Sequence, residues 1–270
     1  MNDVLEAVLA DLAAEGEVIE SWVAGLSDEA WRQSTPAEGW DIATTIAHLA
    51  WTDEVAVIAA GAVTEAGKEA WDSLVLQAIA DPTGYVDACA LDIGKLPAPE
   101  LLARWQSARP ALGEALRAFP DGQKMPWFGP PMSPASMATA RLMESWAHGI
   151  DIADALGIAA EPSDRIKNVV HLGVRTRNFA FGNNGLEAPG EEFRVELTAP
   201  SGALWTWGPE DAAQSVKGSA YDFCLLVTQR RHRDDLDLVA TGADAETWLE
   251  IAQAFAGPSG EGRAPQGADA

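Results

Sequence analysis

Residues 133–157 read SPASMATARLMESWAHGIDIADALG, and this stretch decides how the first part of the chain is interpreted. It opens with Ser133 and Pro134, and proline is well tolerated in the first turn of a helix because its missing N–H would have no partner there. It closes at Gly157, the residue type that most often follows the last turn. The stretch therefore predicts one long helix that starts near Ser133 and runs to about Leu156.

Three other stretches show apolar residues at the spacing of a helix that buries one face. They cover residues 3–25, about 42–60 and 98–118, and Asp41 precedes the second of them as a capping residue. A shorter helix is predicted near 66–80, inside the connection between the second and third long helices. Four long helices with such a crossover connection predict a four-helix bundle.

After about residue 160 the pattern changes to shorter elements, and two neighbouring stretches predict a β-hairpin. The predicted elements are a helix over 163–181, strands over 193–198, 204–207 and 214–217, a helix over 219–230, a strand over 236–240 and a helix over 245–255. The fold class is therefore predicted as α+β, with a four-helix bundle over 1–160 followed by a smaller α/β domain over 161–256. Residues 257–270, rich in Gly, Pro and Ala, are expected to form a disordered tail.

The composition narrows the class of protein and of partner. Apolar residues make up 47% of the chain and no apolar run is long enough to cross a bilayer, so a globular protein without a membrane partner is expected. The net charge of −23 repels phosphate backbones, which makes nucleic acid a poor partner and leaves a small-molecule substrate as the expected one. The only cysteines, Cys89 and Cys224, lie far apart, and the N-terminus lacks a basic leader region, so a cytoplasmic location is expected. The oligomeric state stays open between a monomer and a homodimer.

Two histidines and one glutamate fall inside the predicted helices in a pattern that suits a metal ion. Glu144 and His148 are four residues apart, so a helix places both side chains on one face. His48 lies in the second long helix, and two imidazoles with one carboxylate bind divalent metals while leaving a position for water or substrate. Asp151 is expected to orient a ligand imidazole by a hydrogen bond, and Arg141 to neutralise Glu144. From spacing alone, a surface ion pair and a packed core histidine remain the alternatives.

Two motifs around these residues resemble a known family. Residues 39–49, GWDIATTIAHL, resemble the second-helix motif of the DinB-like superfamily, in particular its mycothiol-dependent maleylpyruvate isomerase branch. Residues 144–151, ESWAHGID, resemble the fourth-helix motif of that branch. The resemblance implies that His48, Glu144 and His148 are the metal ligands, with zinc as the expected metal and mycothiol or another low-molecular-weight thiol as the cofactor.

The C-terminal part adds a basic cluster to an otherwise acidic chain. Region 163–255 resembles the C-terminal domain of the same isomerase branch, which uses an arginine near the metal. Arg230, Arg231 and Arg233 are therefore the candidates for a catalytic residue that holds a substrate carboxylate through two hydrogen bonds. The alternative is a helix end whose cations meet the C-terminal dipole and are balanced by neighbouring acidic residues.

Together, the metal ligands and the resemblance predict an enzyme that activates a thiol at its metal. The thiol would add to a small electrophilic, carboxylate-bearing substrate, isomerise it or be transferred onto it. A metal lowers the pKa of a bound thiol, so no protein cysteine is needed as the nucleophile. Two alternatives stay open: a hydrolase or cyclase that uses metal-bound water, and a non-catalytic binding module in which the metal ties two helices together. An exchangeable coordination position favours an enzyme, whereas four protein ligands favour the structural role.

Overall fold

The computed structural model describes residues 3–260 and 262–267. The chain divides into two compact units, of which the first ends at Ala159 and the second begins at Ala160. Each unit has its own buried apolar residues. Among the described residues, no helix is both long enough and apolar enough to span a bilayer.

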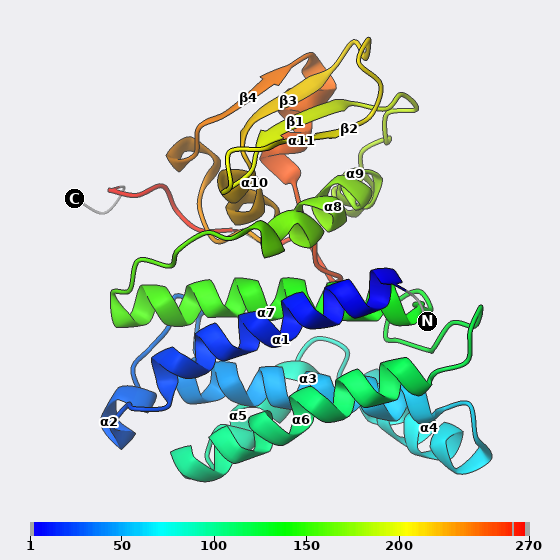
Figure 1. Ribbon diagram of the computed structural model, residues 1–270, viewed down its shortest axis with the longest axis vertical. Helices are drawn as coiled ribbons and strands as arrows, with labels where there is room; N and C mark the ends of the chain where they lie inside the picture. Colours follow the sequence, from blue (N-terminus) through cyan, green and yellow to red (C-terminus); the bar gives the residue numbers. More distant parts are fainter. Residues whose placement is uncertain (1–2, 261, 268–270) are drawn as a thin grey trace. The chain divides into compact units, whose positions relative to one another are not determined.

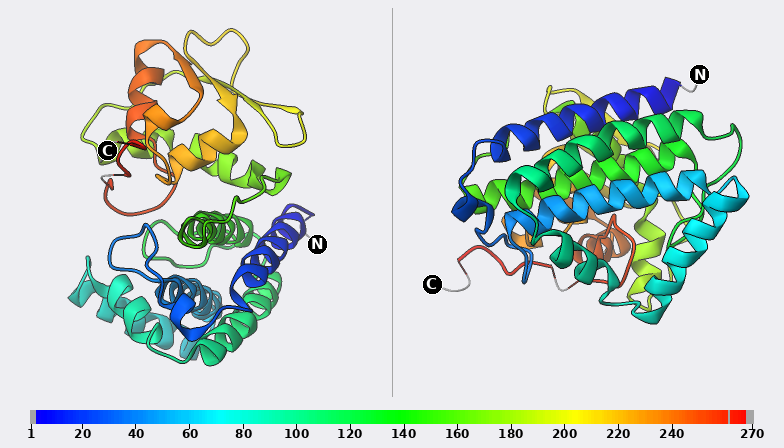
Figure 2. Two further views of the ribbon diagram at one scale, coloured as in Figure 1. Left: turned by 90° about the vertical axis from the view of Figure 1, so that its left-hand side faces the viewer. Right: turned by 90° about the horizontal axis from the view of Figure 1, so that it is seen from below.

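The first unit is built on four long helices, as predicted: α1 (Asp3–Val23), α3 (Ile42–Gly61), α6 (Ala98–Ala118) and α7 (Pro134–Leu156). α1 packs against α7, while α3 packs against both α6 and α7. The connection from α3 to α6 contains α4 (Glu65–Ala80) and α5 (Tyr85–Ile93), and it returns the chain so that α3 and α6 run in the same direction (Figure 1). α3 and α7 run in opposite directions, and the left view of Figure 2 looks along both. The bundle therefore has the predicted crossover.

The ends of α3 and α7 are set by their own capping residues. The Oδ1 atom of Asp41 accepts a hydrogen bond from the backbone N–H of Thr44 at 2.7 Å, which satisfies a free donor at the start of α3. Ser133 caps α7 in the same way, by accepting from the N–H of Ser136 at 3.2 Å. Gly157 ends α7 with φ +66°, a left-handed conformation that glycine adopts without a steric penalty.

α3 lies inside the bundle, and nearly all of its side chains from Ile42 to Ala56 are buried. One apolar cluster joins Ala56 to Leu142 near the start of α7, and another joins Ile46 to Ile152 near its end. Between these two clusters, α3 and α7 carry polar side chains that are also buried or half-buried. This polar interval contains the candidate metal ligands.

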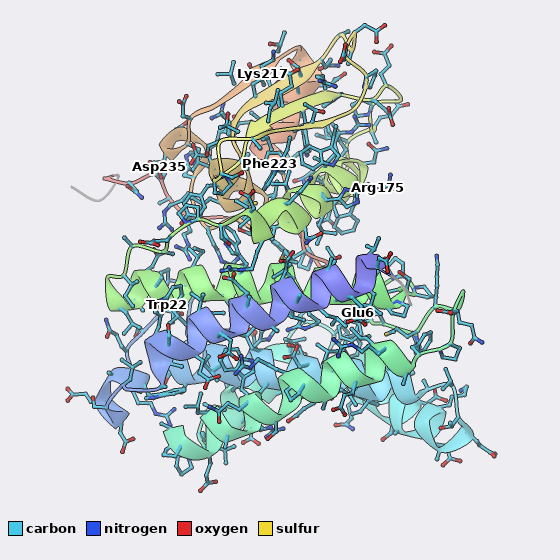
Figure 3. The ribbon with its side chains drawn as sticks, viewed as in Figure 1. Glu6, Trp22, Arg175, Lys217, Phe223 and Asp235 are labelled. Atoms are coloured by element: carbon cyan, nitrogen blue, oxygen red, sulfur yellow. The ribbon has the colours of Figure 1, made fainter. Side chains whose placement is uncertain are left out.

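The second unit combines short helices with a four-stranded sheet of order β2-β1-β3-β4. Its strands are β1 (Arg194–Thr198), β2 (Leu204–Trp207), β3 (Ser215–Ser219) and β4 (Leu238–Thr241). β1 and β2 form the predicted antiparallel hairpin, whereas β1 and β3 are parallel. The helices are η1 (Asp164–Ile166), α8 (Lys167–Arg175), α9 (Arg177–Asn183), α10 (Ala220–Val227), η2 (Arg233–Asp235) and α11 (Ala243–Ile251). In the core, the ring of Phe223, labelled in Figure 3, lies 5.6 Å from that of Trp248.

The α+β class is confirmed, but three predicted helices of the second unit are too long. The helix over 245–255 already ends at Ile251, as α11. The helix over 163–181 breaks at Thr176, where the hydroxyl contacts the carbonyl of Gln253 at 2.7 Å and the chain turns between α8 and α9. The helix over 219–230 ends at Val227, because Gln229 has φ +58° and cannot continue a right-handed helix.

Two further helices were not predicted, and the predicted tail is described only in part. α2 (Asp28–Trp31) and α5 were not predicted, because each is too short to show a clear helical period. Residues 257–260 and 262–267 of the predicted tail contain no helix or strand. The remaining tail positions, 261 and 268–270, lie outside the described residues.

Candidate metal centre

The two helices α3 and α7 bring the three predicted ligands together. His48 comes from α3 and is 7% exposed, while Glu144 and His148 come from consecutive turns of α7 and are half-buried. One nitrogen or oxygen of each residue lies within 4.8 Å of the others. Residues that are about a hundred positions apart in sequence therefore present their donor atoms to one point in space.

The separations of the donor atoms suit a small divalent metal ion. The Oε2 atom of Glu144 lies 3.3 Å from Nε2 of His48 and 3.4 Å from Nε2 of His148. Zinc binds histidine nitrogen and carboxylate oxygen at roughly 2.0–2.1 Å, and a tetrahedron of that size separates neighbouring donors by roughly 3.3 Å. The residues present therefore fit a metal ion with little movement of their side chains.

Asp151 fixes the orientation of the His148 ring. Its Oδ2 atom lies 3.1 Å from Nδ1 of His148, the ring nitrogen that does not contact Glu144. Because the Asp151 carboxylate is an acceptor, the hydrogen bond assigns the proton to Nδ1 and leaves the lone pair of Nε2 directed at the candidate site. Asp151 is 1% exposed and does not belong to the group of three converging donors.

The site also favours the protonation states that bind metals. Burial lowers the pKa of His48 to about 4, although the hydrogen bond with Glu144 opposes the shift. Burial alone would raise the pKa of Glu144, but hydrogen bonds with His148 and His48 hold it well below its usual range. A neutral imidazole and an ionised carboxylate are the forms that coordinate a metal. Among the described residues, Nδ1 of His48 has no hydrogen-bond partner.

Trp40 is a site residue that the sequence analysis did not identify. Its ring stacks on His148 at 5.5 Å between centroids and tilts against His48 at 5.1 Å. Trp40 directly precedes the Asp41 cap of α3, so the loop that starts the helix also places an indole over both imidazoles. Its position within the GWD segment, next to the cap of a ligand-bearing helix, was the available signal.

Arg141 has a different partner from the one predicted. Its Nε atom donates to Oδ1 of Asp53 at 2.9 Å, in an ion pair whose side chains are each 3% exposed. The prediction that Arg141 neutralises Glu144 assumed that a residue one turn away on α7 would face the same carboxylate. Instead, the long side chain reaches the later part of α3.

The basic cluster of the second unit follows α10 in a turn. Arg230 and Arg231 donate to the nearby carbonyls of Thr228 and Arg230 at 2.6 and 2.7 Å. Arg233 donates to the carbonyls of Leu236 and Leu238 at 3.2 and 2.5 Å. The local hydrogen bonds agree with a helix-end role, while the role of these arginines in substrate binding stays a prediction.

The sequence comparisons identify the family of the first unit. Residues 12–153 match the family described as the mycothiol maleylpyruvate isomerase N-terminal domain. The chain belongs to this family. Residues 189–241 match a second family, which is described as wyosine base formation.

Relatives and solved structures each resemble this chain over most of its length. Two uncharacterized proteins from two strains of Mycobacterium tuberculosis are each 54% identical over 255 residues, covering 94% of this chain and 97% of theirs. The crystal structures of the mycothiol-dependent maleylpyruvate isomerase and of one of its mutants share the fold, with a TM-score of 0.58 and 15% identity. Each match covers 84% of this chain and 89% of the other. The resemblance seen in the sequence motifs is therefore confirmed at the level of family and fold.

Proposed function

We propose that this chain is a metal-dependent enzyme in which His48, Glu144 and His148 hold a divalent ion, with zinc as the expected metal. The observation that carries the proposal is the convergence of two Nε2 atoms on one carboxylate oxygen, at 3.3 and 3.4 Å. Membership of the mycothiol maleylpyruvate isomerase family supports a low-molecular-weight thiol as the second reactant. The proposed reaction is addition of that thiol to a small electrophilic acid, its isomerisation, or transfer of the thiol onto it.

The residues of the site have separable tasks in this proposal. When bound, the metal would supply a Lewis acid that lowers the pKa of a thiol. Three protein donors leave one position of a tetrahedron open for that thiol. Asp151 holds the His148 ring, and Trp40 covers the imidazoles and limits the access of water from its side. The acidic surface disfavours a nucleic-acid partner, so a small molecule is the proposed substrate.

Metal content tests the ligand set directly. The purified protein should contain about one divalent ion per chain, and His148→Ala should lose it because two donors seldom retain zinc. His232→Ala is the matched control, since it removes a histidine of the second unit that contacts Asp234. Full metal retention by His148→Ala would overturn the assignment of the site.

Thiol dependence separates the proposed enzyme from its alternatives. The metal-loaded protein should convert members of a panel of electrophilic acids only when mycothiol or a related thiol is added. Turnover with water alone would favour a hydrolase or cyclase. No turnover, together with a coordination shell closed by a fourth protein ligand, would favour a structural metal clip.

The basic cluster enters the proposal as the carboxylate-binding element. We propose that Arg230, Arg231 or Arg233 holds the acid group of the substrate, and one of the three Arg→Ala variants should then raise KM strongly. Removing one partner of a buried charge-assisted contact costs roughly 2–5 kcal/mol. Unchanged kinetics in all three variants would restrict the cluster to its local hydrogen bonds.

A further inference from the structure

Beyond the candidate ligands, the polar interval between α3 and α7 contains further charged and polar side chains. Thr52 and Asp53 continue it on α3, and Arg141 continues it on α7. Thr52 is 7% exposed, Asp53 is 2% exposed and Arg141 is 3% exposed. Three polar groups are therefore buried next to the metal centre without belonging to the group of converging donors.

Hydrogen bonds connect Arg141 to the backbone of His48. The Nη2 atom of Arg141 donates to Oγ1 of Thr52 at 2.5 Å, and that hydroxyl donates to the carbonyl oxygen of His48 at 2.6 Å. The Nε atom of the same guanidinium donates to Asp53 at 2.9 Å. One side chain of α7 therefore holds two residues of α3 and, through a hydroxyl, the peptide group of a candidate ligand.

We propose that Arg141, Asp53 and Thr52 are positioning residues that set the register of α3 against α7 at the metal centre. This inference rests on the proposed function, because the register matters for the same three donors. A buried ion pair adds little net stability, since desolvation offsets the attraction, and its best-attested use is to select one register. Sliding α7 by one turn would break both contacts of Arg141 and leave its charge without Asp53.

The apolar clusters on either side constrain the register of the two helices less directionally than these hydrogen bonds do. Apolar contacts are not directional, and helices joined by them tolerate small shifts. A metal site needs its donors within about 0.5 Å of the working geometry. Hydrogen bonds to a planar guanidinium are directional, so the Arg141 contacts supply what the neighbouring apolar packing lacks.

The double variant Asp53→Leu/Arg141→Met tests this inference, because it removes both charges and leaves none buried alone. Its matched control is Glu54→Gln, which weakens the two contacts of 2.7 Å between Glu54 and Arg104 that join α3 to α6 instead of α7. Two quantities would be measured: zinc affinity by chelator competition, and the histidine side-chain NMR signals of the metal-free protein. The chain has four histidines, so His171 and His232 of the second unit serve as internal references.

We expect zinc binding in the double variant to weaken at least about ten-fold, as for other residues that orient metal ligands. The signals of His48 and His148 should shift in the metal-free protein, whereas those of the two reference histidines and of the control variant should not. Unchanged His48 and His148 signals with zinc affinity equal to wild type would overturn the inference. If wild-type protein binds no zinc, the proposed function fails, and the metal-free spectra alone then decide whether the register has changed.

Thr52 provides a second test that keeps both charges. Thr52→Val removes the hydroxyl between Arg141 and the His48 carbonyl with little change of shape, and Thr52→Ser restores it. The valine variant should shift the His48 signal and weaken zinc binding, and the serine variant should return both toward wild type. Equal behaviour of the two variants would show that the hydroxyl contact plays no part in positioning His48.

Discussion

The bundle contains two kinds of ion pair between helices, and they differ in their exposure to water. Arg141 and Asp53 join α7 to α3 with both side chains 3% exposed. Arg117 and Glu6 join α6 to α1 at 2.9 Å, but their side chains are 50% and 33% exposed. Glu6, labelled in Figure 3, lies near the beginning of α1. The same chemistry therefore occurs both in the core and at the rim of the bundle.

This difference in exposure determines whether an ion pair affects the stability of the bundle or the geometry of the site. Water and salt screen the rim pair, so its contribution to stability is small. The core pair is hardly screened, but each charge must first lose its water, and the pair contributes little net free energy. Its loss is costly only when one partner remains alone. A buried pair beside the ligands therefore acts as a constraint on geometry, whereas the rim pair is close to neutral.

Replacing the arginine of each pair should give the largest difference in the free energy of unfolding. Arg141→Met leaves Asp53 uncompensated in the core and should lower the free energy of unfolding by about 3–5 kcal/mol. Arg117→Met should lower it by about 0–1 kcal/mol. Urea unfolding of the two variants against wild type measures both values. Equal losses would show that exposure does not distinguish the pairs.

Acidification should have the next largest effect on stability, because it protonates the buried imidazole of His48. The pKa of His48 in the folded chain is about 4, below its ordinary value of 6.5, so the unfolded chain binds more protons between these values. The metal-free protein should therefore lose stability as the pH falls through this window, by roughly 3 kcal/mol in total.

The pH experiment needs His48→Gln as its reference. Burial raises the pKa of Asp53, which acts in the opposite direction because protonation of that carboxyl favours the folded state. The difference between wild type and His48→Gln reports the contribution of His48 together with its coupling to Glu144. A variant that lost stability as steeply as wild type between pH 6.5 and 4 would contradict the assigned pKa.

A smaller effect is expected at the residue that orients His148. Asp151→Asn should weaken zinc binding about 10–100-fold, because the amide is a poorer acceptor for the Nδ1 proton. Asp92→Asn is the control, because Asp92 is an exposed aspartate that contacts Lys95 on the surface at 3.2 Å. Zinc titration of both variants should separate them, and equal affinities would remove Asp151 from the site.

The smallest contrast lies at the ends of the two helices that carry the ligands. Gly157 follows α7 with φ +66°, so Gly157→Ala should destabilise the protein by about 1 kcal/mol. Gly61 is the last residue of α3, has no positive φ, and has open space where a Cβ would lie, so Gly61→Ala should stabilise by about 0.4–1 kcal/mol. Thermal unfolding should show shifts of opposite sign.

The sequence predicts the bundle well because its long helices carry continuous apolar faces. His48, Glu144 and His148 could be proposed as neighbours because the spacing on α7 and the motif on α3 are both local signals. The partner of Arg141 could not be predicted, since an arginine side chain reaches several turns of the facing helix. Trp40 was missed because the ring contacts of a loop residue depend on how the loop folds back over the helices.

In the second unit, the periodicity of the sequence predicts the ends of the helices less accurately. The break at Thr176 coincides with a contact to Gln253, which is far away in sequence. The early end of α10 depends on the left-handed conformation of Gln229, a residue type that gives little warning of it. Tertiary contacts and backbone conformation therefore decide what periodicity leaves undetermined.

The crossover between α3 and α6 has a consequence for how such proteins diversify. No candidate ligand lies between residues 62 and 133, which make up most of the sequence between His48 and Glu144. The α4–α5 segment within it exposes Leu76 and Ile79, which are 68% and 66% accessible. Related proteins can therefore change the length or the side chains of this segment while keeping the same three donors. Their specificity can then change without a change of the metal ligands.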